Sequence, residues 1–222
     1  MEYFDFDTKL ISITKPLIDK IKSSEELIAF CARVSNPKNQ VNNETASKLL
    51  SYCKRNSHWS IFEMVDATIE ISCARDIGRQ ILRHRSFSFQ EFSQRYAEAE
   101  KFTWREPRLQ DVKNRQNSIE DVDRDIIDTW QDIQTDSLTQ AKKNYKWALN
   151  MGIAKEVART ILPEGLTMST MYMKGSLRSW IHYCDLRCGN GTQKEHRAIA
   201  LDIKQLIKQN YPQVYEVISR FS

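Results

Sequence analysis

The segment from Arg83 to Arg95 combines side chains that bind an anionic, planar ligand. Its thirteen residues include three arginines, one histidine, one glutamate and three serines, with phenylalanines and glutamines between them. A guanidinium group can donate two parallel hydrogen bonds to a phosphate, and a serine hydroxyl adds a neutral donor. Aromatic rings offer a surface for a planar group. The segment therefore predicts a binding site for a nucleotide or a nucleic acid.

The composition of the whole chain is that of an ordinary globular protein. The 222 residues are 41% hydrophobic and 28% charged, so extensive disorder is not expected. The net charge of +4 is too small to indicate nucleic-acid binding by itself. The length is most simply accounted for by one domain, and we predict a single domain over residues 1–222.

The cysteine content and the apolar patterns indicate a cytoplasmic protein. Five cysteines, an odd number, lack the dense spacing of a secreted disulfide framework. The acidic start of the chain does not resemble a signal peptide. No stretch approaches the roughly 20 apolar residues of a membrane span, so no membrane partner is expected.

Clear strand and helix patterns flank the arginine-rich segment. Apolar and polar residues alternate from Met64 to Cys73, as in a half-buried strand. From Arg75 to Arg83 the apolar period is helical, so Gln80 and Arg83 project together at the end of this helix. Residues 86–118 have no sustained period, and a long functional loop is predicted there.

The rest of the chain predicts a mixed α+β fold, with an antiparallel-rich sheet flanked by helices and a long helical region. Further strands are expected at residues 8–15 and 166–173. Helices are expected from Ser23, from Asn43, over 119–150 with at most one break, before Pro163, from Ser176, and after Gly191 with an interruption at Pro212.

The arginine-rich segment resembles the signature of the flavin-dependent thymidylate synthases. That signature is Arg-His-Arg, here starting at Arg83, then seven residues and a serine, here Ser93. Glu91 before the serine and Arg95 after it complete the match. Four further segments resemble family elements in the family's order, namely His58–Glu63, Gln80–Arg83, Ala158–Pro163 and Leu177–Arg187.

The resemblance implies an enzyme that methylates dUMP to dTMP. In this family 5,10-methylenetetrahydrofolate supplies the carbon and leaves as tetrahydrofolate, while FAD reduced by NADPH supplies the hydride. The resemblance also implies the thymidylate synthase-complementing fold. It further implies a homotetramer with active sites at subunit interfaces, and no nucleic-acid partner.

The resemblance assigns the site residues by their positions in the motifs. The residues expected to bind dUMP are Gln80, Arg83, Glu91, Phe92, Ser93, Gln94, Arg95, Arg159 and Arg187. The residues expected to bind FAD are Ser60, Arg83, His84, Arg85, Glu91, Arg178 and His182. This division is chemically reasonable, because Arg95 and Arg159 suit a phosphate and Gln80 suits an amide edge of uracil.

Arg187 is the residue expected to act in catalysis. By resemblance it contacts the pyrimidine, where a fixed positive charge favours ionisation at N3. Ser93 has no histidine or lysine clearly paired with it as an activating base, so a binding role is favoured over a nucleophilic one. No cysteine is given a covalent role.

Three residues depart from the family pattern. Met64 replaces a histidine that often follows Phe-Glu, Ser176 replaces an asparagine, and Gln94 replaces a small residue. The departures at Met64 and Ser176 reduce the support for the individual FAD contacts that the resemblance implies. They leave the nucleotide-binding set intact.

Arg178 and Arg187 are nine residues apart, which places them on opposite sides of a continuous helix. Three explanations remain open. The helix breaks between them, the two arginines face different regions of one extended site, or they serve different active sites in an oligomer.

Other readings of the same residues predict other functions. Arginines interleaved with phenylalanines also suit a single-stranded nucleic-acid binder. An inactive relative that keeps the fold as an interaction protein is a third possibility.

Cys184 and Cys188, near His182 and His196, have spacings within the range of zinc sites. Their helical spacing favours buried apolar residues instead, so no metal site is predicted.

Overall fold

The computed structural model describes residues 3–214 and is built around a four-stranded antiparallel sheet. The strand order is β1-β2-β6-β3, and every neighbouring pair is antiparallel. The strands are β1 (Asp7–Ile13), β2 (Asp66–Ala74), β6 (Met168–Ser176) and β3 (Ser88–Glu91). The α+β class with an antiparallel sheet is confirmed, and the strands expected at 8–15, 64–73 and 166–173 are present with small shifts at their ends.

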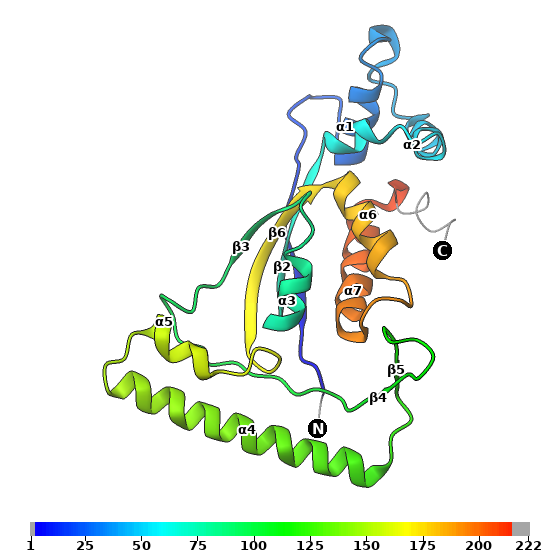
Figure 1. Cartoon of the computed structure of the whole chain (residues 1–222). Helices are drawn as coiled ribbons and strands as arrows, with labels where there is room; N and C mark the ends of the chain where they lie inside the picture. Colours follow the sequence, from blue (N-terminus) through cyan, green and yellow to red (C-terminus); the bar gives the residue numbers. More distant parts are fainter. Residues whose placement is uncertain (1–2, 215–222) are drawn as a thin grey trace.

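One face of the sheet is apolar and carries the core. The inward side chains of β2 and β6, including Ile69, Ile71, Met171 and Met173, are fully buried. The alternate residues face outward and are polar or exposed, which is the period-two pattern of a sheet covered on one side. Figure 1 shows α3, α6 and α7 together on the covered side.

These three helices are α3 (Arg75–Ile81), α6 (Leu177–Arg187) and α7 (Lys194–Asn210). The Ser176 side chain accepts a hydrogen bond from the Ser179 backbone nitrogen, so this departure from the family pattern serves as the N-cap of α6. A helix from Ser176 is thus confirmed. The prediction for the chain after Pro212 extends to residues 215–222, which lie outside the described residues.

The N-terminal helices pack above one end of the sheet (Figure 1). They are α1 (Ser24–Ala32), capped by Ser23 as predicted, and α2 (Ala46–Arg55), which starts three residues after the expected Asn43. Two 3-10 helices accompany them, η1 (Pro37–Asn39) and η2 (Trp59–Glu63). Contacts of η2 with α6 connect this part to the core.

The long helical region is one unbroken helix, α4 (Arg124–Asn150), that runs across the opposite end of the molecule (Figure 1). Its expected start at residue 119 was early, because 118–119 form a short strand instead. After it come α5 (Lys155–Ala158) and the 3-10 helix η3 (Arg159–Ile161), ahead of Pro163 as predicted. Within residues 3–214 no helix has the length and apolar character that crossing a membrane requires.

The prediction of a long loop over residues 86–118 was wrong only where short strands form. The segment contains the edge strand β3 and begins a small hairpin made of β4 (Leu109–Gln110) and β5 (Ser118–Ile119). β3 pairs with β6, more than eighty residues away in sequence, as in Phe89 opposite Met173. A four-residue strand carries too few residues to show a period, so only this distant partner reveals it.

A close contact between β6 and the segment after α3 joins the sheet to the arginine-rich region. Gly175 lies against the ring of Phe87, and a β-carbon added at Gly175 would fall 2.4 Å from that ring. The Phe87 ring is held in turn by Trp180, with ring centroids 4.7 Å apart. The Phe87 ring therefore cannot shift away from an added methyl group, and this packing requires glycine at residue 175.

Gly175→Ala is expected to lower the free energy of unfolding by about 1–3 kcal/mol, because the added methyl group overpacks a filled core. Chemical denaturation monitored by tryptophan fluorescence measures the change. Gly191→Ala is the matched control, since nothing lies within 4 Å of its added carbon. The control should stay within about 0.5 kcal/mol of wild type. Equal midpoints for the two variants would contradict the packing argument.

Candidate functional site

The end of α6 meets the turn that follows α3. Arg187, the last residue of α6, donates from Nε to Nε2 of His84 at 3.0 Å. His84 also packs edge-on against Tyr183, with centroids 4.9 Å apart. The structure thus brings together two predicted site residues that are 103 positions apart.

His84 is neutral in this arrangement. Burial lowers its pKa, and the neighbouring Arg187 guanidinium lowers it further, to about 4 from 6.5. A neutral imidazole can accept a hydrogen bond at Nε2, whereas an imidazolium cannot. The neutral ring therefore holds the guanidinium of Arg187 in place without cancelling its charge.

Gln80 lies in the last turn of α3, beside the same cluster. Its Nε2 donates to Oε1 of Gln193 at 2.7 Å, and its Oε1 is 3.4 Å from Nδ1 of the buried His196. Neither partner was predicted as a site residue. His196 lies with Ile199 and Ile203 on the apolar side of α7 that faces the core. A histidine in such an apolar stripe needs a hydrogen-bond partner, and this pattern could have identified it in the sequence.

Glu91 is engaged by protein groups at the end of β3. Its carboxylate is within 3.5 Å of Arg75 and 3.4 Å of Arg79, and it accepts a hydrogen bond from Ser169 at 3.0 Å. The same two arginines also contact Glu164. This network fixes Glu91 against α3, and the role of Glu91 in ligand binding stays a prediction.

The predicted phosphate-binding arginines meet beside α5. Arg95 Nε is 2.9 Å from the Glu156 carboxylate, and Arg159 Nε donates to the Glu156 backbone oxygen at 3.3 Å. Ser93 lies at the start of this turn, where its hydroxyl accepts from the Arg95 backbone nitrogen at 3.3 Å. The arrangement gives two partly exposed cations and a hydroxyl in one neighbourhood, which suits a phosphate.

Phe92 and Gln94 differ in their surroundings. Phe92 is 37% exposed, whereas Gln94 is buried, and its amide nitrogen has no hydrogen-bond partner among residues 3–214. A buried donor without a partner is uncommon in a folded protein and indicates a missing acceptor. The position fits a bound ligand or water next to the Ser93–Arg95 turn.

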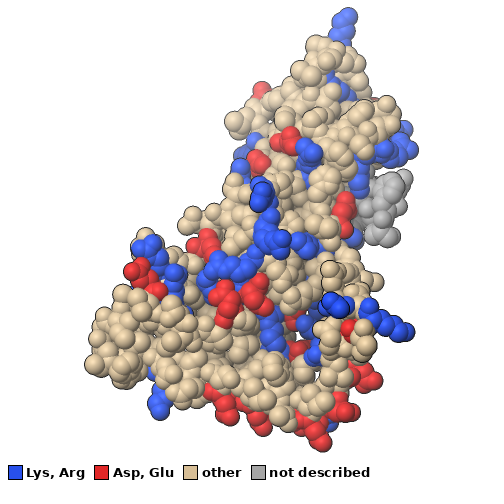
Figure 2. Space-filling view, in the orientation of Figure 1, with Lys and Arg blue, Asp and Glu red and all other residues tan. Residues whose placement is uncertain are grey.

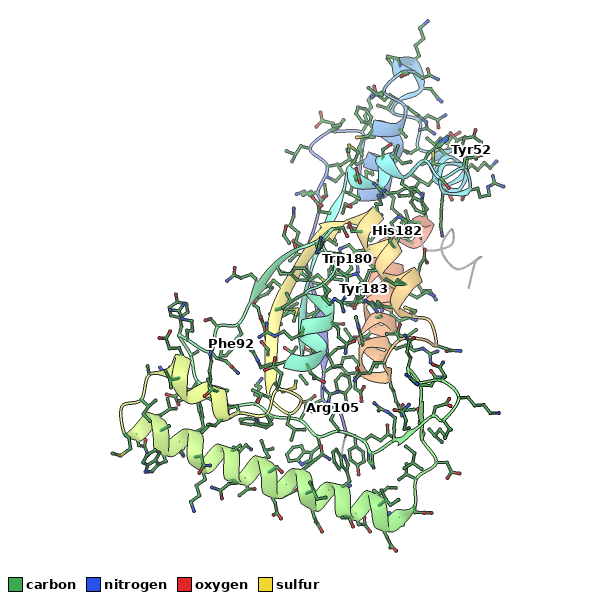
Figure 3. All side chains as sticks on the ribbon, viewed as in Figure 1. Tyr52, Phe92, Arg105, Trp180, His182 and Tyr183 are labelled. Atoms are coloured by element: carbon green, nitrogen blue, oxygen red, sulfur yellow. The ribbon has the colours of Figure 1, made fainter. Side chains whose placement is uncertain are left out.

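A third group lies where η2 meets the start of α6. Arg178 pairs with Glu63 at 2.5 Å, and the exposed ring of His182 packs at a tilt against Trp59, with centroids 4.5 Å apart and an interplanar angle of 54°. Burial, followed by Arg178, lowers the pKa of His182. Figure 3 shows His182 on α6, pointing away from the Trp180 and Tyr183 side chains that enter the core. Ser60, within η2, is exposed beside this group.

Arg83 and Arg85 are exposed, and their side chains form no hydrogen bond or ion pair within the described part of the chain. In Figure 2 basic side chains gather across the middle of the visible face, around the place where Figure 1 draws α3, with acidic side chains beside them. Free guanidinium groups and an accessible hydroxyl can donate to the phosphates of a dinucleotide, and the Trp59–His182 pair offers an aromatic surface, so these residues fit a flavin dinucleotide.

The continuity of α6 removes one explanation for its two arginines. α6 runs unbroken from Leu177 to Arg187, and Arg178 contacts Glu63 while Arg187 contacts His84. The two arginines therefore face different regions. This placement is compatible with both remaining explanations, one extended site or two sites in an oligomer.

The phenylalanines of the arginine-rich segment are not displayed for base stacking. Phe87 is buried, and Phe89 is partly buried against the core. Two of the three rings on which the nucleic-acid alternative depends thus pack inside the protein. This packing argues against that alternative.

Cys184 lies in α6, and Cys188 directly follows the last residue of this helix. Cys184 is buried and Cys188 is partly buried, as their helical spacing predicts. Among residues 3–214, no group of three or more histidine, cysteine, aspartate or glutamate side chains is placed to hold a metal ion.

Comparisons with known proteins agree with these observations. Residues 16–213 match the family model described as thymidylate synthase complementing protein. A probable flavin-dependent thymidylate synthase of Paramecium bursaria Chlorella virus 1 is 50% identical over 95% of this chain and 97% of the relative. A flavin-dependent thymidylate synthase of Synechocystis sp. is 52% identical over 94% of this chain and 97% of the relative.

The fold is also found in a solved structure. A UMP/dUMP methylase from Streptomyces cacaoi, bound with 5-Br dUMP, superposes with a TM-score of 0.84 at 24% identity, over 99% of this chain and 97% of that one. The likeness supports the architecture described above. From the family match and the two relatives, we conclude that this chain belongs to the thymidylate synthase complementing proteins, the family of the flavin-dependent thymidylate synthases.

Proposed function

We propose that the protein is a flavin-dependent thymidylate synthase that converts dUMP to dTMP. The observation that carries the proposal is the Arg187–His84 pair, which presents a fixed guanidinium beside Gln80. This pair stands within a chain that matches the family over nearly its whole length. In this proposal the carbon comes from 5,10-methylenetetrahydrofolate and the electrons from NADPH.

The proposed roles follow from what each side chain can do. Arg187 places a permanent positive charge beside the pyrimidine and stabilises negative charge that develops at N3. Gln80 binds the amide edge of the uracil, and Arg95 and Arg159 bind the phosphate, where Glu156 orients both arginines. Arginine keeps its proton, so the contribution of Arg187 is electrostatic.

The cofactor is proposed to be FAD, held by Arg83, His84 and Arg85 on one side and by Ser60, Arg178 and His182 on the other. When bound, it supplies the hydride that completes the new methyl group. Because a flavin hydride removes the need for a protein nucleophile, Ser93 serves as a binding residue. Glu91, Phe92 and Gln94 complete the proposed ligand contacts.

The active site is proposed to combine residues from different subunits of a homotetramer. Arg95 and Arg159 lie beside α5 at one end of the sheet, while Arg187 lies at the end of α6 on its other side (Figure 1). One small nucleotide would have to span this separation within a single chain. An assembly in which the α5 end of one subunit meets the α6 end of another removes the difficulty.

The activity itself is the first test. Purified protein loaded with FAD should be yellow, and it should form dTMP from dUMP only when methylenetetrahydrofolate and NADPH are both present. Arg187→Ala should lower kcat/KM for dUMP about 10²- to 10³-fold, because the charge that stabilises the anionic pyrimidine is removed.

The matched control for this loss is Arg124→Ala, which removes an exposed arginine that pairs with Asp128 on α4, away from the proposed site residues. The control should keep wild-type activity. A flavin-loaded wild-type protein that makes no dTMP would refute the proposed function. An active wild type with an unchanged rate in Arg187→Ala would contradict the catalytic role proposed for Arg187.

Subunit complementation tests the shared site. Arg159→Ala and Arg187→Ala should each be inactive alone, yet tetramers assembled from both variants should regain up to about a quarter of wild-type activity. This fraction corresponds to the sites that receive an intact residue from each of two chains. Mixed tetramers without activity would place both arginines of a site in one chain.

The neutral state of His84 gives a prediction about pH. Its ring resonances in NMR spectra should not titrate between about pH 5.5 and 8, because its pKa is about 4. Since this value lies below the unfolded one, the stability contributed by His84 is present above pH 6.5 and is lost as the pH falls through about 4. Arg187→Ala removes a neighbouring charge and should raise the pKa. A wild-type ring that titrates near pH 6.5 would contradict this environment.

A further inference from the structure

Five side chains form a continuous chain of hydrogen bonds beneath the proposed uracil site. Tyr183 Oη is 3.1 Å from His196 Nε2, and His196 Nδ1 is 3.4 Å from Gln80 Oε1. Gln80 Nε2 is 2.7 Å from Gln193 Oε1, and Gln193 Nε2 is 2.9 Å from Glu195 Oε2. We refer to these five residues as the amide relay.

The Glu195 end of the relay can only accept hydrogen bonds. Glu195 is 3% exposed, and its other oxygen is 2.7 Å from Arg108 and 3.6 Å from Arg105. Burial alone would raise the pKa of Glu195, but the hydrogen bond from Arg108 and further donors outweigh it and lower the pKa. The group is therefore a carboxylate without a proton to donate.

This carboxylate fixes the direction of every bond in the relay. Gln193 must turn its NH₂ group to Glu195, so its oxygen faces Gln80. Gln80 must then turn its own NH₂ group to Gln193, which leaves its oxygen facing His196. The reversed order would place the Gln193 oxygen against the carboxylate, with no hydrogen between them.

The His196 end adapts to the direction set at the other end. His196 is fully buried, and burial, with Arg187 and His84 nearby, lowers its pKa to about 3, so the ring carries one proton. Donation to Gln80 requires that proton on Nδ1, and Nε2 then accepts from the Tyr183 hydroxyl. The opposite tautomer with a rotated hydroxyl would serve a reversed relay equally well. Glu195 is therefore the residue that sets the direction of the hydrogen bonds in the relay.

Uracil and cytosine differ in the feature that the relay controls. Uracil presents an N3–H donor beside the O4 acceptor, whereas cytosine presents an N3 acceptor beside an amino donor. The relay uses one N–H and one oxygen lone pair of the Gln80 amide. One N–H donor and one lone-pair acceptor remain for a ligand, and the relay fixes which of them lies on which side of the amide. An amide held in one orientation matches only one of these two edges, and turning it over breaks both relay bonds.

We propose that Glu195 is a positioning residue that sets the hydrogen-bond direction of Gln80 through Gln193, and thereby makes the site selective for uracil over cytosine. The inference rests on the proposed function, in which Gln80 binds the pyrimidine. The direction of the relay itself is independent of any ligand. These two parts can be tested separately.

Glu195→Gln is the decisive variant because it keeps the shape and reverses the direction. Its oxygen would stay on Arg108, so its NH₂ group would face Gln193 and donate. Gln193 and Gln80 would then turn over, and the proton of His196 would move from Nδ1 to Nε2. Nitrogen NMR of the His196 ring should show the Nδ1–H tautomer in wild type and the Nε2–H tautomer in Glu195→Gln.

Calorimetric titration of the FAD-loaded protein with dUMP and dCMP tests the selectivity. Wild type should bind dUMP at least about 100-fold more tightly than dCMP, and Glu195→Gln should reduce this ratio about tenfold or more. Glu106→Gln is the matched control, since it also removes a carboxylate beside Arg108, at 3.5 Å, but lies outside the relay. The control should keep both the ratio and the tautomer.

Gln193→Ala provides a second test should Glu195→Gln fail to fold, because Gln193 is exposed and its loss leaves the core intact. It disconnects Gln80 from Glu195, so the ratio should again fall about tenfold. An unchanged ratio in Gln193→Ala, or in Glu195→Gln together with an unchanged tautomer, would overturn the inference. A wild-type protein that binds no dUMP would refute the proposed function instead, while the tautomer change would still test the direction of the relay.

Discussion

The packing of α6 against the sheet is the constraint on which the other parts of the site depend. Trp180 is fully buried and donates from its indole nitrogen to the Ala67 backbone oxygen of β2 at 3.1 Å. Phe87 fills the space between Trp180 and Gly175. Burial of these rings contributes several kcal/mol by area alone, at roughly 25 cal/mol per Å². Because the helix is fixed at its middle, both ends are fixed as well, with Arg178 at η2 and Arg187 at His84.

Charged and polar groups around this core are arranged so that buried ones have partners. Arg105 contacts Asp76 and lies near Glu195, and it enters from the segment that crosses below α3 (Figure 3). Glu195 contacts Arg108, which also contacts Glu106. A buried carboxylate without such partners would be costly, so this network ties the 97–120 segment to α7. The same network supplies the fixed charge at one end of the amide relay.

The site residues therefore fall into groups held by different parts of the fold. Gln80, His84 and Arg187 depend on α3 and α6, whereas Arg95 and Arg159 depend on the turn after β3 and on α5. The first group is rigid because its members are partly buried, with Arg187 bonded to His84 and Gln80 bonded to His196 and Gln193. The second is more exposed and is oriented by one residue, Glu156, whose carboxylate contacts Arg95 and whose backbone oxygen accepts from Arg159. A rigid pocket for a ring and an accessible site for a phosphate are consistent with the chemistry proposed for each.

The sequence by itself determined the family signature, the α+β class and most of the helices and strands, because these depend on local spacing and periodicity. It placed the helix from Arg75 within two residues of its observed end at Ile81 and the helix start at Ser23 correctly, and it predicted Arg187 as a site residue by its position in a motif. Only the tertiary structure revealed β3, since four residues show no period without their partner in β6. Likewise, only the fold brought His196, Gln193 and Glu195 to Gln80, across more than one hundred residues. Hydrogen-bond direction depends on which groups meet in space, and spacing along the chain carries no information about it.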